Sequence, residues 1–398
     1  MSGAAGVESP VGRVATEADE GLRAGVRESA LAIARKYPRS YWLEQARQGR
    51  HVEEMWHALA DSGLLGLGVP ESMGGSGGGL TELVLLTHVL SSEGVPTLHL
   101  VLTGLVHSSL VRNGTPEQVA RYVAPSMSAT ARLCLGVTEP DAGTNTFAIK
   151  SVASKHERGW KISGQKIFIS GADEADHMFT IVRTPDTPAP SGRPGLSVFM
   201  VPLGGRGVEC HPLSIEIIQP DSQFSVFLDE VVVGPETLVG PEGGGAKAMF
   251  DALDSERLLV AAMAIGLGEY ALGKAVAYAR ERAPFGKPIG SYQGVQHRLA
   301  RAKAHLEAAY RVTVEAAEGY DQGASVKDLC GMAKLLASEA GTEACDAAIQ
   351  VHGGYAFDTD YDVSTIWPLV RLFSIAPVNN EMILNSIGQH VLGLPKSY

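Results

Sequence analysis

Residues 249–263 read MFDALDSERLLVAAM, and this stretch fixes the architecture of the second half of the chain. Its apolar side chains recur at the spacing of one helix face, and these residues are Met249, Ala252, Leu253, Leu259, Val260 and Met263. A single charged residue, Glu256, falls on the same face. The pattern therefore predicts a helix that packs against other helices and carries one carboxylate into the interior.

The position of Glu256 admits two roles. An ionised carboxylate in apolar surroundings is unfavourable, so it either finds a cationic partner or has its pKa raised. A carboxylate with a raised pKa suits a general base. Alternatively, Glu256 forms a structural ion pair with Arg257, Lys247 or a more distant cation, without any catalytic role. Helix geometry alone leaves both roles open.

Three regions of different texture follow one another along the chain. Residues 16–125 are helical in pattern, residues 133–233 carry short β-branched and aromatic runs cut by Gly and Pro, and long helical patterns return from Gly245. We therefore expect an α+β multidomain protein with a disordered tail at residues 1–15. Its domains would be an N-terminal helical domain at 16–130, a middle antiparallel β domain at 131–236 and a C-terminal helical bundle at 237–398.

Composition limits the class of protein. With 398 residues, of which 45% are hydrophobic and 19% charged, the chain can form two or three packed regions. The net charge of -11 disfavours nucleic acid and anionic membranes as partners. The cysteines at 134, 210, 330 and 345 show no close pairing and no metal-ligand spacing, so we expect no metal and a reducing cytoplasm.

The chain shows neither a membrane span nor a secretory signal. Its longest strongly apolar stretch, residues 258–268, is much shorter than a membrane span of roughly 20 residues. The first residues lack the basic start and apolar core of a secretory signal. We expect a soluble protein.

A second cluster follows the helix at residues 281–293, which read ERAPFGKPIGSYQ. Pro and Gly end the helix here and leave Arg282 at its terminus, with an amide at Gln293. An arginine at such a break can hold a phosphate through its fork of donors, and the amide can add a second contact. The alternative is an ordinary helix end whose dipole favours a cation. On this segment alone, the alternative is better supported.

Three further segments decide between these interpretations, and they read LGVTEPDAGTN at 135–145, WKISGQKIFISG at 160–171 and QVHGGY at 350–355. Together with Arg282, Phe285, Gly286 and Gln293, they stand in the order and spacing typical of the acyl-CoA dehydrogenase family of flavoproteins. The chain resembles that family over most of its length.

The resemblance implies an N-terminal helical domain, a middle β domain and a C-terminal four-helix bundle, with FAD between the last two. Leu135, Val137 and Thr138 would meet the flavin ring with backbone and hydroxyl groups. Ser170 would bond near flavin N5, and Phe168 would cover the ring. Many relatives carry Trp at the latter position, so Phe168 keeps the stacking face but loses the indole N–H.

Two further groups of residues would hold the rest of the cofactor. The pyrophosphate and adenosine half is assigned to Arg282, Phe285 and Gln293. The glycine motif would reach the FAD of a neighbouring subunit through Gln350, Gly353 and Gly354, since glycines allow close backbone approach.

The resemblance also assigns substrate contacts. Thr144 stands where relatives usually carry Ser, and it would contact the thioester-bearing arm. Asp254 and Arg257 match positions near the CoA chain.

Many relatives place the catalytic base late in the chain, in a Tyr-Glu-Gly-Thr segment. Here the corresponding stretch reads IAPVNNEM at 375–382, which puts Pro377 or Asn380 in the glutamate position, and neither can act as a base. A subset of the family carries its glutamate in a Glu-Arg dipeptide on the earlier helix, as at residues 256–257. Glu256 is therefore the predicted base.

Glu381 is the fallback for the base. When the segment is aligned on Asn380, Glu381 and Met382, however, Glu381 fits a cofactor contact better than the role of base. Asn379 fits a cofactor contact as well.

These features predict FAD-dependent α,β-dehydrogenation of an acyl-CoA thioester to trans-2-enoyl-CoA. Glu256 would take the α-proton and flavin N5 the β-hydride. An electron-transfer flavoprotein is the expected electron acceptor, and a cytoplasmic homotetramer in fatty acid and lipid metabolism is the expected form. Two alternatives stay open: a related flavoenzyme that acts on a carrier-protein thioester or uses oxygen, and a non-catalytic assembly subunit of the same fold.

Overall fold

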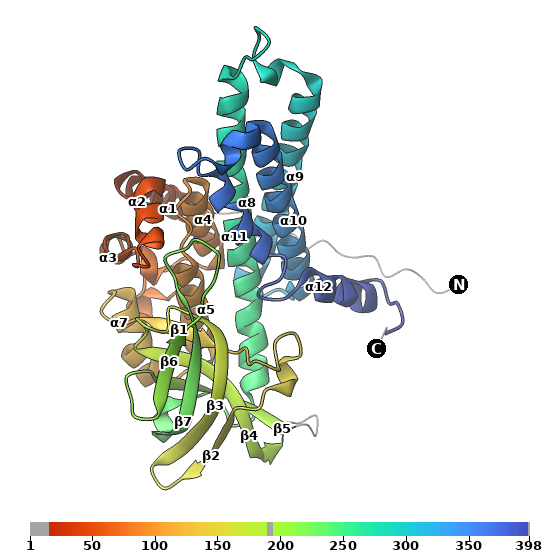
Figure 1. Ribbon diagram of the computed structural model, residues 1–398. Coiled ribbons are helices and arrows are strands. Elements are labelled where there is room, and N and C mark those ends of the chain that lie inside the picture. The colour runs from red at the N-terminus through yellow and green to blue at the C-terminus, as the bar shows by residue number, and fades with distance from the viewer. Residues whose placement is uncertain (1–15, 189–193, 397–398) are drawn as a thin grey trace.

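Three structural regions follow one another along the chain (Figure 1). The computed structural model describes residues 16–188 and 194–396, so the predicted tail at residues 1–15 lies outside the described residues. Helices form the first region, strands the second and helices again the third. The predicted α+β architecture is confirmed.

The N-terminal region begins with a helix cap at Thr16, its first described residue, and is helical from Glu17. Thr16 caps the first helix, because its Oγ1 accepts from the backbone N–H of Asp19 at 3.2 Å while its own N–H donates to the Asp19 carboxylate at 2.8 Å. The helices are α1 (Glu17–Lys36), α2 (Arg39–Arg47), α3 (Glu53–Asp61), α4 (Leu80–Ser92), α5 (Leu98–Asn113), α6 (Pro116–Gln118) and α7 (Ala124–Met127). Helices α4 and α5 are buried around most of their circumference, which makes them core helices.

The middle region is one sheet in which neighbouring strands follow the order β6-β7-β3-β2-β4-β5-β8. The strands are β1 (Leu133–Gly136), β2 (Val152–His156), β3 (Gly159–Ser170), β4 (His177–Pro188), β5 (Pro194–Pro202), β6 (Val208–Pro212), β7 (Gln223–Val233) and β8 (Leu238–Val239). Most pairs are antiparallel, but β1 and β2 each run parallel to β4. A parallel pair needs a long connection, and the chain between β1 and β4, which includes β2 and β3, supplies it.

The C-terminal region is a bundle with three long members, which are α8 (Gly245–Glu281), α9 (Gln293–Asp321) and α10 (Lys327–His352). Its remaining helices, α11 (Trp367–Leu372) and α12 (Asn380–Ser386), are short. Pro368 lies in the first turn of α11, where proline's missing N–H costs nothing, and Pro377 lies in the segment between α11 and α12.

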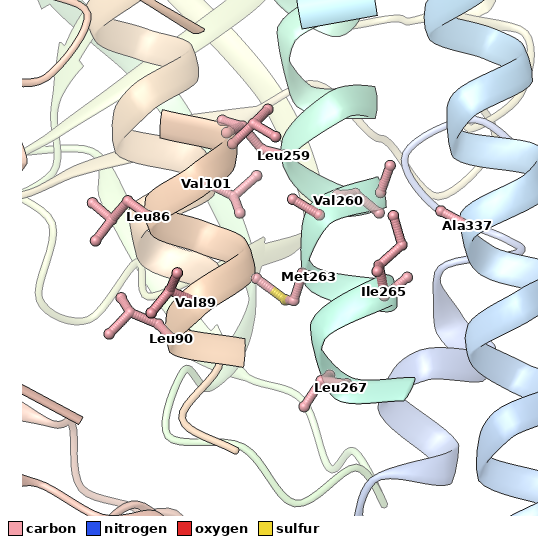
Figure 2. Packing of buried hydrophobic residues seen from close by; sticks show 14 of the residues in the cluster. Leu86, Val89, Leu90, Val101, Leu259, Val260, Met263, Ile265, Leu267 and Ala337 are labelled. Carbon is pink, nitrogen blue, oxygen red and sulfur yellow. The ribbon is translucent and has the colours of Figure 1, made fainter. Parts of the chain in front are cut away.

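Helix α8 is central to the core. Figure 2 shows it between α4 and α5 on one side and α10 on the other. Leu259 and Met263 face α4 and α5, while Val260 and Ile265 face Ala337 of α10. Each of these side chains is buried, and burying one contributes about 1.5–3 kcal/mol.

Of the helices in the described ranges, α8 alone is long and apolar enough to cross a membrane. However, 72% of its apolar window is buried inside the protein. Because the core helix of a soluble protein passes the same test, this match is weak evidence for a membrane span.

Helices α8 and α10 run in the same direction and approach each other closely (Figure 1). A Cβ atom on Gly341 of α10 would come within 2.6 Å of the Ala264 carbonyl, and one on Gly268 would come within 3.0 Å of the Gly341 Cα. Larger side chains at these glycines would force the helices apart. Two helical turns are about seven residues, so this register places Lys334 of α10 level with Arg257 of α8.

Candidate active site

Glu256 lies on α8 with its side chain buried. The residue is 8% exposed, and its Oε2 atom has no hydrogen-bond partner among the described residues. Burial raises the pKa of Glu256 to about 7, an effect that Arg257 and Lys334 oppose. The adjacent cation, Arg257, bonds Asp254 instead. The carboxyl group can therefore change its protonation state near neutral pH.

Asp254 and Arg257, both predicted substrate contacts, form one unit beside Glu256. The Nη1 atom of Arg257 donates to Asp254 Oδ1. Arg257 is 9% exposed, and its Nε finds no acceptor in the described parts of the chain. A buried donor without an acceptor costs about 1–3 kcal/mol, which a bound ligand with an acceptor would offset.

The loop before α12 joins the β region to the bundle. Asn379 caps α12, because its Oδ1 accepts from the backbone N–H of Met382 at 2.9 Å. Its Nδ2 donates to Thr144 Oγ1 at 3.1 Å, so a predicted cofactor contact and a predicted substrate contact meet. Glu381, the fallback base, is exposed on the first turn of α12 and lacks the burial that distinguishes Glu256.

Lys334 of α10 holds the same loop from within the bundle. It is fully buried, and its Nζ donates to the Val378 carbonyl at 2.5 Å and to Asn380 Oδ1 at 2.9 Å. Desolvation lowers the pKa of Lys334 to about 8, and Arg257 adds to this. Sequence reasoning missed this residue. Its signal was a lone cation in the small and apolar run CGMAKLLA at 330–337.

The predicted flavin contacts gather at the ends of two strands. Leu135 lies on β1, Val137 and Thr138 follow it, and Phe168 and Ser170 lie on β3. The Ile167 N–H donates to the Thr138 carbonyl at 2.9 Å, which joins the two segments. Phe168 is 57% exposed and has a φ of +59°, a conformation that is strained for phenylalanine. An exposed ring on a strained backbone fits contact with a planar ligand.

A buried ion pair stands behind these contacts, and sequence reasoning missed it. Lys166 is fully buried, and its Nζ donates to Glu139 Oε1 at 2.8 Å, to the Ile181 carbonyl at 2.7 Å and to the Val137 carbonyl at 3.3 Å. Burial lowers the pKa of Lys166 to about 8 against the effect of Glu139. The signal was a lysine in the inward-facing alternation of Trp160 and Ile162. The pair fixes the segment that carries Val137 and Thr138.

The other predicted cofactor residues lie at the far end of α8 (Figure 1). Arg282 follows the end of α8, the 83% exposed Phe285 lies in the turn, Gln293 begins α9, and the exposed Gln350 is near the end of α10. An open cavity of about 550 Å³ is lined by Tyr278, Arg282, Pro284, Ile289, Val351, His352, Gly353, Gly354, Tyr355 and Asp358. Arg282 and the glycine motif thus meet, although they are far apart in sequence.

Helix α8 separates this second set from the flavin contacts. Its 37 residues span about 55 Å at the usual rise of an α-helix. The sheet packs near its beginning, and Arg282 follows its end (Figure 1). One chain therefore does not bring all predicted cofactor residues to one dinucleotide.

Comparison with known families covers nearly all of the chain. Residues 16–130 match the acyl-CoA dehydrogenase N-terminal domain, residues 134–219 the middle domain and residues 243–392 the C-terminal domain. The chain belongs to the acyl-CoA dehydrogenase family. It is 35% identical to acyl-CoA dehydrogenase FadE12 of Mycobacterium tuberculosis over 379 residues, which are 94% of this chain and 97% of that protein.

Solved structures of acyl-CoA dehydrogenases share the fold. Butyryl-CoA dehydrogenase from Megasphaera elsdenii has a TM-score of 0.88 at 26% identity, covering 96% of this chain and 99% of that chain. A chain in a structure described as the electron transferring flavoprotein of Acidaminococcus fermentans has a TM-score of 0.89 at 26% identity, covering 95% and 98%. The family assignment thus extends to the whole fold.

Proposed function

We propose that this protein dehydrogenates an acyl-CoA thioester between its α and β carbons to give the trans-2-enoyl thioester, and that Glu256 removes the α-proton. As an acyl-CoA dehydrogenase family member, it is an oxidoreductase and an FAD-dependent flavoprotein. The observation that carries the choice of base is the buried Glu256 Oε2, which has no partner among the described residues. Because its pKa is raised to about 7, the group can accept a proton and release it again at neutral pH.

The residues present fit FAD. Phe168 offers an exposed aromatic face, and the Ser170 hydroxyl beside it is held by the side-chain amide of Gln223 at 2.7 Å. Arg282, in the cavity with Gly353 and Gly354, offers a cation and accessible backbone of the kind that binds a pyrophosphate. When bound, FAD supplies the acceptor for the β-hydride.

The protein's own groups perform the remaining tasks. Glu256 holds the α-proton after its removal, and the free Nε–H of Arg257 donates to a polar atom of the substrate. The bond between Asn379 and Thr144 keeps the β region and the bundle together where the thioester would lie. The surrounding apolar helices exclude water from Glu256.

Replacing Glu256 by Gln tests this assignment. The amide keeps the shape but cannot accept a proton, so anaerobic bleaching of bound FAD by the best acyl-CoA of a short, long, branched and aromatic panel should slow by about 10²–10⁴-fold. FAD content should stay unchanged. Glu381→Gln is the matched control with an exposed carboxylate. Near-normal bleaching in Glu256→Gln with slow bleaching in Glu381→Gln would transfer the role of base to Glu381.

A homo-oligomer, most simply a tetramer built from dimers, completes the site in this proposal. The support is the separation of the flavin contacts from Arg282 along α8. Glu256→Gln and Arg282→Ala would then damage opposite parts of each composite site. Mixing the two variants during refolding should restore about a quarter of wild-type activity. Half of randomly formed dimers contain one copy of each variant, and such a dimer has one intact site out of two. Without any recovery, or with an active monomer in sedimentation, the shared site is wrong.

The electron acceptor in this proposal is an electron-transfer flavoprotein, and the setting is cytoplasmic fatty acid metabolism. The support is the shared fold with a chain from the electron transferring flavoprotein structure of Acidaminococcus fermentans. Turnover with purified electron-transfer flavoprotein should proceed under nitrogen. Equal turnover with oxygen alone would instead favour the oxygen-using alternative.

A further inference from the structure

Two buried cations lie at the level of Glu256, and they differ in what holds them. Arg257 is bonded to Asp254 on its own helix, whereas Lys334 comes from α10. We propose that Lys334 is a positioning residue for the base: clamped between α10 and the loop before α12, its ammonium group faces Glu256 and favours the ionised form of that carboxylate. The catalytic part of this inference rests on the proposed role of Glu256.

The register of helices α8 and α10 brings Lys334 to the level of Glu256. Gly341 fits against Ala264 so closely that its absent side chain would meet the Ala264 carbonyl. Both helices run in the same direction, so moving back two turns on each brings Lys334 beside Arg257 and its neighbour Glu256 (Figure 1). The glycine contact thereby fixes the level of the ammonium group.

The hydrogen bonds of Lys334 fix the position of its ammonium group. Its ammonium group donates to the Val378 carbonyl and to Asn380 Oδ1, and Asn380 donates in turn to Ser338 Oγ at 3.1 Å. Lysine is a flexible side chain, and burial with two fixed acceptors holds its charge in one place. The charge cannot move into solvent.

The charged groups near Glu256 determine which cations act on its carboxylate. Lys334 interacts electrostatically with Glu256, Arg257 and Glu381, and both Arg257 and Asp254 act on Cys330. On helices α4 and α5, which pack against α8, His88 contacts Glu269, His99 packs on Trp56 and His107 bonds Ser126. Lys303 of α9 also bonds Glu269. Arg257 also acts on Glu256, but it lies on the same helix, so among the described residues Lys334 is the cation that acts on Glu256 from outside α8.

The test is an infrared titration of the FAD-bound protein, which needs no substrate. Subtracting the spectrum of a matched Glu256→Gln variant isolates the protonated carboxyl band of Glu256, whose midpoint is expected near pH 7 in the wild type. Lys334→Met removes the cation, so the carboxylate becomes less favourable and the midpoint should rise by about one pH unit. Lys334→Gln keeps an N–H donor for the loop but no charge, and it should show the same rise. Lys334→Arg keeps the charge and should retain the wild-type midpoint.

Lys274→Met is the matched control. As Lys334 ties α10 to a later loop, Lys274 ties α8 to a later segment by bonding Asp362 and the Tyr361 carbonyl. This variant should lower the melting temperature without moving the midpoint. If the midpoint stays in place in Lys334→Met and Lys334→Gln while Glu256→Gln bleaches slowly, the proposed role of Lys334 is wrong and the assignment of Glu256 as base stands. If the midpoint rises but Glu256→Gln bleaches normally, the proposed base is overturned, and the catalytic role of Lys334 with it.

Discussion

Glu139 in the β region and Glu256 in the bundle are buried to a similar degree, at 5% and 8% exposure, yet their ionisation is shifted in opposite directions. Burial alone would raise the pKa of Glu139, but Lys166 and the backbone N–H groups of Lys150 and Ser151 hold it below its ordinary value. Burial raises the pKa of Glu256 to about 7. Burial therefore sets the cost of the charge, and the partners decide whether the group stays ionised.

The difference follows from the surrounding secondary structure. Strand pairing brings Lys166 against the loop between β1 and β2, where backbone N–H groups outside helices and strands are also free to bond a carboxylate. The middle of a helix such as α8 offers no free N–H groups, because each bonds a carbonyl one turn earlier. The first environment makes a rigid frame, and the second leaves a titratable group.

The largest contrast should appear when each glutamate is replaced by Gln. Glu256→Gln should lose about 10²–10⁴-fold in the rate of flavin bleaching while keeping its stability near neutral pH or gaining some. Glu139→Gln should do the reverse: its FAD-loaded fraction should bleach within a few-fold of the wild type, but FAD content and melting temperature should fall. Stopped-flow bleaching beside thermal melts measures both, and similar profiles for the two variants would erase the contrast.

Lys166→Met should be the most destabilising of the frame variants. It leaves Glu139 buried without its cation, at a cost of about 3–5 kcal/mol in the free energy of unfolding. The double variant with Glu139→Gln removes the uncompensated charge and should recover part of that loss. Urea unfolding and FAD retention check both. If the double variant is no better than Lys166→Met, the pair is not the source of the cost.

The two glutamates should also give opposite pH dependences of stability. Glu256 keeps its proton in the folded state up to about pH 7 but releases it near pH 4.5 in the unfolded state. The free energy of unfolding therefore falls by up to about 3 kcal/mol as the pH rises from 4.5 to about 7. Glu256→Gln should therefore gain stability relative to the wild type between pH 4.5 and 8.

The pKa of Glu139 is lowered in the folded state, so its contribution is present above its ordinary pKa and is lost as pH falls through the lowered one. Glu139→Gln should thus be least destabilising in acid. Urea unfolding across pH measures both variants, and parallel curves for the two would contradict this assignment.

The smallest effect is expected at the contact between the β region and the bundle. Asn379→Ala removes the cap of α12 and the bond to Thr144, which should cost about 1 kcal/mol in stability. Because Thr144 is left without its partner, KM should rise more than kcat falls. Thr144→Val is the matched variant on the other side, and additive effects of the two changes would show that the bond is not coupled to substrate binding.

The sequence predicted the features that depend on local pattern. The apolar stripe around Glu256 predicted its burial, and the long helical patterns predicted from Gly245 onward are confirmed by the three long helices of the bundle. Of the cations expected for a structural ion pair with Glu256, Arg257 bonds Asp254 instead.

Features that depend on distant partners were not predictable in this way. Lys166 and Glu139 are 27 positions apart and meet only through the pairing of strands and loops. Lys334 bonds a loop residue 44 positions later, and helix packing brings the two together. The parallel pairing of β1 with β4 likewise depends on the whole sheet. No local periodicity carries such information.

The length of α8 has a consequence for how the protein behaves on dilution. If one copy supplies the flavin contacts and another supplies Arg282, as proposed, cofactor capture and subunit association become a linked equilibrium. Free FAD would then stabilise the assembly by mass action, and dilution would release FAD and subunits together. The apparent affinity for FAD would depend on protein concentration and would not be a fixed property of one chain.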